Sequence, residues 1–153
     1  MEIKDQSEAE IRNLAMRQTY LEEAVQDIIL NGGYTFKGCA EDQAFQMLVM
    51  RLLFDMDYDS ILPEEIVDGG QDKQIDIIRI ENNERENFAH IHIIQTKYRN
   101  GFGSNELIGI RNGLTWIFEK PRVEYHGLKN QALINKIDEI QRTTLVLGFV
   151  CRQ

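Results

Sequence analysis

The sequence lacks three features that would place a protein in a membrane or outside the cell. Its 153 residues contain no apolar run of the roughly 18 residues that cross a bilayer. The N-terminal stretch MEIKDQSEAE has no apolar segment of the kind that a secretory signal needs. Its two cysteines, Cys39 and Cys151, are far apart and without metal-ligand spacing, which favours reduced thiols. These absences predict a cytoplasmic protein without membrane contacts.

Positive charge is also scarce, since 17 basic residues face 25 acidic ones and the formal net charge is -8. This balance argues against a simple nucleic-acid-binding module, which usually has a basic face. The charge is uneven, however. Arg51 is the single base between Glu41 and Asp72, whereas five of the seven charged residues in 97–122 are basic (Lys97, Arg99, Arg111, Lys120, Arg122). The pattern suits a phosphate-facing surface beside a cation site. It equally suits ordinary solvated faces.

The apolar pattern fits one domain that mixes helices and strands. A capping box from Ser7 to Glu10 opens the first helix. Periodicity predicts helices over residues 7–31, 39–56, 104–120 and 128–140, and strands over residues 61–67, 75–80, 88–98 and 143–151. This order predicts an α/β (α+β) fold, a mixed β-sheet flanked by helices in a three-layer core.

Polar residues in two neighbouring strands suggest chemistry. Asp76 lies between isoleucines in one strand, and Gln95 and Lys97 lie two apart near the end of the next. Phosphodiester hydrolysis needs oxygen ligands for a hard cation and a positive group for the developing charge. If the strands pair as a hairpin, alternation lets these polar faces converge. Glu41 or Asp42, in the first turn of a helix, could complete the set, although acids there also stabilise the helix dipole.

These motifs resemble the PD-(D/E)xK nuclease superfamily. The resemblance rests on the stretch DGGQDKQID ending at Asp76, the stretch IQTKY that contains Lys97, and the helix start EDQAF at Glu41. Within the superfamily the chain is similar to the Mrr-like restriction endonucleases and, more closely, to the N-terminal domain of abortive-infection phage-resistance (AIPR) proteins. The resemblance implies a restriction-endonuclease-like αβββαβ core over residues 38–153, with residues 1–37 as an additional N-terminal helical extension.

The resemblance also implies roles for individual residues. Asp76, Gln95, the Thr96 carbonyl and Glu41 (or failing it Asp42) would hold Mg²⁺ or Mn²⁺. Lys97 would position the water and stabilise the pentavalent phosphate. Apart from the resemblance, the basic and aromatic residues Lys97, Tyr98, Arg99 and Arg111 are expected to contact nucleic acid, although a packing role is equally open for Tyr98.

The chain departs from the family pattern in two places. Gln95 stands where the superfamily usually has an acid, which weakens Mg²⁺ binding, although the Mrr-like branch also uses glutamine. Lys73 and Gln74 stand where glycine is favoured. Family members are often longer, which implies that the chain is one domain of a larger polypeptide.

Simpler interpretations remain open for several of these residues. Asp76 and Lys97 could be a paired buried acid and base without function, because buried charges are usually paired. Asp68 and Asp72 are expected to form the turn. His90 and His92 share a strand face, but such histidines more often face a helix or solvent, so no zinc site is expected.

The expected function is a metal-dependent endonuclease in phage defence, which acts on DNA rather than RNA. A homodimer is the expected assembly, since two sites can cut both strands of a duplex. The alternative is a catalytically degenerate nuclease fold that binds nucleic acid or a protein partner.

Overall fold

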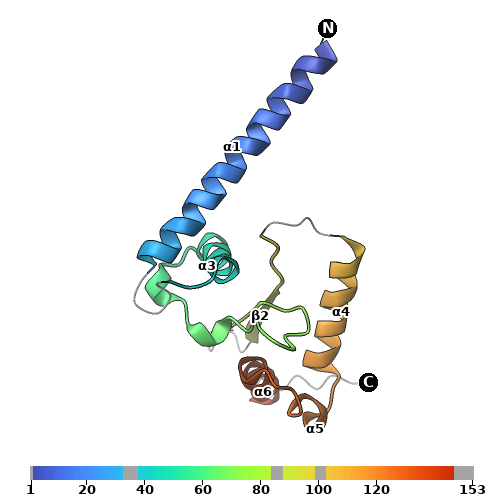
Figure 1. The fold of residues 1–153 in the computed structure, drawn as a ribbon. Helices are drawn as coiled ribbons and strands as arrows, with labels where there is room; N and C mark the ends of the chain where they lie inside the picture. Colours follow the sequence, from blue (N-terminus) through green and yellow to red (C-terminus); the bar gives the residue numbers. More distant parts are fainter. Residues whose placement is uncertain (1, 33–37, 84–87, 99–102, 147–153) are drawn as a thin grey trace. The chain divides into compact units, whose positions relative to one another are not determined.

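The computed structural model describes residues 2–32, 38–83, 88–98 and 103–146 (Figure 1). The chain forms two compact units, residues 1–60 and 61–153. They contain helices and a two-stranded antiparallel sheet, so the predicted mixture of α and β structure is confirmed. In the ranges that the structure describes, no helix has both the length and the apolar character needed to span a membrane. The predicted domain boundary between residues 37 and 38 stays a prediction.

The first unit consists mainly of two contacting helices, α1 (Glu2–Asn31) and α3 (Glu41–Phe54), followed by the 3-10 turn η1 (Tyr58–Ser60). Val25 and Ile28, near the C-terminal end of α1, are fully buried, whereas residues 10–20 are exposed. The predicted start of α1 at Ser7 is wrong, because the helix begins at Glu2 and Ser7 lies inside it. The preceding Glu, Lys and Gln residues are good helix formers, so the helix extends past the expected cap.

The second unit is organised around a β-hairpin. Strands β1 (Ile77–Asn83) and β2 (Phe88–Ile94) pair antiparallel, with Ile77 opposite Ile94 and Asn83 opposite Phe88. The hairpin that the sequence predicted is therefore present. Isoleucines opposite each other on one face pack toward the helical core, and these are Ile78 with Ile93 and Ile80 with Ile91.

Helices α4 (Ser104–Phe118), α5 (Arg122–Tyr125) and α6 (Gln131–Val146) supply the rest of the core. Asn130 fixes the start of α6, because its Oδ1 accepts from the Leu133 N–H at 2.9 Å. Its Nδ2 donates to the Val67 carbonyl at 2.7 Å and so links α6 to the segment before β1. Together with β1 and the segment before it, these helices form one cluster of buried residues, namely Val67, Ile75, Ile78, Ile117, Tyr125, Leu133, Ile134, Ile137 and Ile140.

Two predicted strands differ from the structure. Residues 61–67 contain the 3-10 turn η2 (Pro63–Glu65) and a single bridge between Ile66 and Ile77, because Pro63 cannot donate to a ladder. The strand predicted over residues 143–151 is wrong for residues 143–146, which continue α6. A short apolar run does not distinguish a buried strand from a buried helix. The remainder of that run lies outside the described residues.

The strand predicted to reach Tyr98 ends at Ile94. Gln95, Thr96 and Lys97 therefore follow β2 instead of lying within it. The alternation of faces used to place Gln95 and Lys97 does not extend to them.

Candidate functional site

The candidate site begins with the turn that leads into Asp76. Three non-glycine residues there have left-handed backbone conformations, with φ of 65° at Gln71, 60° at Lys73 and 62° at Gln74. Such conformations cost about 1–2 kcal/mol per residue unless surrounding contacts impose them. Asp72 imposes part of the turn, since its Oδ1 accepts from Gln74 N–H at 2.7 Å and its Oδ2 from Gly69 N–H at 3.4 Å. The prediction that Asp72 is a turn former is confirmed.

Helix α4 packs closely against the same turn at two glycines, Gly109 and Gly113, which are one helical turn apart. A Cβ on Gly113 would lie 2.6 Å from Ile75 Cδ1 and 2.8 Å from the Lys73 carbonyl oxygen. A Cβ on Gly109 would overlap the end of the Gln74 side chain. The absence of side chains on this face of α4 therefore allows the helix backbone to approach the turn, which fixes the residues before Asp76.

Asp76 joins three segments of backbone. Its N–H donates to the Ile94 carbonyl at 3.0 Å, and its carbonyl accepts from Val67 N–H at 2.8 Å and Asp68 N–H at 3.2 Å. Ile94 also pairs with Ile77, so two successive residues face one residue of β2, as at a β-bulge. A slip of one residue turns a side chain to the other face of the sheet.

This slip explains where the Asp76 carboxylate points. Its Oδ2 accepts two hydrogen bonds from Thr96, from the backbone N–H at 2.5 Å and from Oγ1 at 2.8 Å. Alternation had instead predicted a face shared with Gln95 and Lys97. The two halves of the motif, 20 residues apart in sequence, do meet, but through Thr96. In the part of the chain that the structure describes, Oδ1 of Asp76 accepts no hydrogen bond.

The electrostatic surroundings of Asp76 are unfavourable to its charge. Burial raises the pKa of this carboxyl above its ordinary value of 3.8, and the negative charges of Asp68 and Asp72 raise it further, while the Thr96 hydrogen bonds act in the opposite direction. One carboxylate oxygen from each of Asp68, Asp72 and Asp76 lies within 4.8 Å of the others. A bound cation would relieve this concentration of negative charge.

Gln95 and Lys97 have different surroundings. The Oε1 atom of Gln95 is buried and has no hydrogen-bond partner among the described residues. The Lys97 ammonium lies 3.6 Å from Glu106 Oε1 at the start of α4, with both side chains partly buried. Glu106 also accepts from Gly103 N–H at 2.8 Å, and mainly this bond lowers the pKa of its carboxyl.

Glu41 and Asp42 begin α3 in the first unit, so their convergence with Asp76 stays a prediction. Glu41 Oε1 accepts from Gln26 Nε2 of α1 at 3.3 Å, and Asp42 is exposed.

Among the residues predicted to contact nucleic acid, Tyr98 is half-buried, Arg111 is exposed on α4, and Arg99 lies outside the described residues. The structure adds a pocket of about 340 Å³ between the turn and α4, lined by Lys73, Gln74, Gly109, Asn112, Thr115 and Trp116. The Lys73 ammonium lies 4.2 Å from the centre of the Trp116 ring. Sequence reasoning missed this pair, because the family's preference for glycine at Lys73 and Gln74 was treated as a departure from the pattern and not as the sign of a left-handed turn.

Comparison with known proteins adds no identification. No family model matches the chain, and no curated protein or solved structure shows significant similarity to it.

Proposed function

We propose that the chain is a metal-dependent endonuclease domain of the PD-(D/E)xK type, acting on DNA in defence against phage. The observation that carries the proposal is the contact of Asp76 with Thr96, which joins the acid to the segment bearing Gln95 and Lys97. In this proposal the hairpin is part of a larger three-layer αβββαβ core.

The donor atoms fit a hard divalent cation, Mg²⁺ or Mn²⁺. Asp76 offers its Oδ1, Gln95 its amide oxygen and Thr96 its carbonyl, all oxygen ligands. A buried polar atom without a partner costs about 1–3 kcal/mol, and Gln95 Oε1 is such an atom within the described ranges of the chain. Glu41 would contribute from α3. When bound, the cation would supply positive charge at the scissile phosphate and an activated water.

The remaining roles belong to basic residues. Lys97 would orient the attacking water and neutralise charge on the phosphate in the transition state. To do so, the Lys97 ammonium would leave its ion pair with Glu106 and contact the phosphate instead. Its partly buried position limits its solvation by water. Lys97, Tyr98, Arg99 and Arg111 would position the DNA backbone.

A homodimer would supply a second site for the second strand of a duplex. The outer part of α1 offers apolar residues for such contacts, since Ile11 and Leu14 are 64% and 65% exposed. Light scattering coupled to gel filtration measures the mass directly, and a monomeric mass at micromolar concentration would refute this part.

The second candidate is a degenerate nuclease fold that binds nucleic acid or a protein. Two observations favour it, because they show the key groups engaged within the chain. The Lys97 ammonium is paired with Glu106, and Asp76 Oδ2 accepts a hydrogen bond from Thr96. The two candidates differ in their response to metal.

Thermal unfolding with and without Mg²⁺ tests the proposal. At a metal concentration of about 100 times Kd, binding should raise Tm by roughly 5–10 °C. The increase should disappear in Asp76→Asn and persist in Asp59→Asn, which removes an exposed acid. No response in the wild-type chain to either Mg²⁺ or Mn²⁺ would favour the binding module.

A further inference from the structure

The polar face of the hairpin carries a second group of potential ligands, away from Asp76. Glu81 of β1 pairs with His90 of β2, and Arg79 pairs with His92. Since side chains alternate along a strand, these residues share the face opposite to Ile78 and Ile80. Glu81 is five residues along from Asp76, roughly 16 Å at 3.3 Å per residue.

We propose that Glu81, His90 and His92 form a binding site for a divalent transition metal, of which Zn²⁺ is the representative. One ligand atom of each residue lies within 4.8 Å of the others. Imidazole nitrogen and carboxylate oxygen are the donors that zinc accepts, and three protein ligands leave a position for water.

Part of the geometry already matches such a site. Zinc bonds of about 2.0–2.1 Å in a tetrahedron place neighbouring ligand atoms roughly 3.3 Å apart. His92 Nε2 and Glu81 Oε2 are 3.3 Å apart. The exposed His90 completes the group, its ring stacked on Phe88 with centroids 4.9 Å apart. A rotation of this exposed side chain closes the remaining distance.

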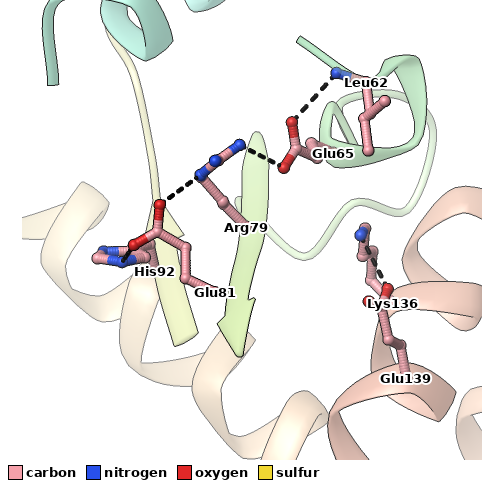
Figure 2. A network of polar contacts seen from close by, with 7 residues as sticks. All are labelled: Leu62, Glu65, Arg79, Glu81, His92, Lys136 and Glu139. Atoms are coloured by element: carbon pink, nitrogen blue, oxygen red, sulfur yellow. Dashed lines mark hydrogen bonds and ion pairs between the residues drawn. The ribbon is translucent and has the colours of Figure 1, made fainter. Parts of the chain in front are cut away.

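A chain of contacts orients the carboxylate (Figure 2). Arg79 Nε donates to Glu81 Oε1 at 2.9 Å, which leaves Oε2 directed at His92. Arg79 NH1 in turn contacts Glu65 Oε1 at 2.9 Å, and Glu65 is buried. Hydrogen-bonded supports of this kind fix ligating carboxylates in metal sites.

The charge of this network also permits a cation. Arg79 lies between two carboxylates, so Glu65, Arg79 and Glu81 together leave one negative charge beside the imidazoles. The ligands come from both strands, so a bound metal would fasten a two-stranded hairpin, which is marginally stable alone.

Calorimetric titration of the full chain with ZnCl₂, after removal of metals with a chelator, tests the site. We expect one equivalent to bind, and binding to fall at least about tenfold in His90→Ala and in His92→Ala. His126→Ala is the matched control and should bind as the wild type does. Circular dichroism establishes that each variant is folded, and His90, being exposed, is the variant least able to disturb the fold.

Two further readouts separate this site from other ligands. Co²⁺ in place of zinc should give a visible spectrum without thiolate charge-transfer bands, which excludes Cys39 and Cys151 as ligands. Asp76→Asn should leave zinc binding intact, so the zinc site is tested independently of the nuclease proposal. Absence of zinc binding in the wild type, or equal binding in wild type and His90→Ala, would overturn the inference.

Discussion

The β-hairpin places two carboxyl groups in surroundings that shift their pKa in opposite directions. At one end Asp76 is half-buried beside Asp68 and Asp72, and burial raises the pKa of its carboxyl. At the other end Glu81 is 42% exposed and bonded to Arg79, which lowers the pKa of its carboxyl. One end of the hairpin therefore gathers three carboxylates within 4.8 Å of one another, whereas the carboxylate at the other end is paired with a guanidinium.

The difference suggests different ligands. A group of carboxylate oxygens suits a hard cation such as Mg²⁺. A paired carboxylate next to two imidazoles suits a borderline metal such as zinc. The variants below are ordered from the largest expected effect to the smallest.

The largest expected effect is the loss of cleavage when the Lys97 ammonium, near the Asp76 end of the hairpin, is removed. Lys97→Ala should reduce cleavage by about 10²–10³-fold, because a donor to developing charge is worth that much. Glu106→Gln releases the ammonium from its ion pair and should retain cleavage. Rates of cleavage per folded molecule decide between the roles, and equal losses in both variants would make Lys97 a structural partner of Glu106.

An intermediate effect concerns the packing of α4 against the turn. Gly113→Ala should lower the free energy of unfolding by about 1–2 kcal/mol, since the new methyl group meets the Lys73 backbone. Gly109→Ala is the control, because it meets only the flexible end of Gln74 and gains helix propensity of about 1 kcal/mol. Urea unfolding measures both, and equal destabilisation would show that the close approach is not specific to Gly113.

The smallest expected effect is on Tm, which should depend on pH in opposite ways in two carboxyl variants. EDTA is present so that no metal is bound. The raised pKa of Asp76 means that its ionisation opposes folding as pH rises above 3.8. Asp76→Asn should therefore raise Tm at pH 7 and match the wild type in acid. The lowered pKa of Glu81 means that its ionised form supports folding above pH 4.5. Glu81→Gln should therefore lower Tm slightly at pH 7, with the difference vanishing as pH falls.

Tm recorded against pH for both variants settles this comparison. Shifts of the same sign at pH 7 would show that the two ends of the hairpin do not differ in the way described.

The sequence predicted the hairpin because alternating isoleucines mark both strands, and Ile78 opposite Ile93 confirms that pattern. It did not predict the contact between Asp76 and Thr96. That contact depends on a bulge-like shift of one residue in the pairing opposite Ile94, and such a shift does not appear in the alternation of apolar and polar residues. It also did not predict that Glu81 lies opposite His90, since the register depends on the loop between the strands. The left-handed turn at Lys73 and Gln74 was not predicted because neither residue is glycine, although the resemblance favours glycine at both positions.

The most direct test of the nuclease proposal is cleavage of labelled single-stranded DNA, double-stranded DNA and RNA with Mg²⁺, Mn²⁺ or EDTA, comparing the wild type with Asp76→Asn. The account predicts that DNA is cut in the presence of metal, that EDTA stops the reaction and that the variant is inactive. Equal cutting by the wild type and Asp76→Asn, or cutting that persists in EDTA, would contradict it.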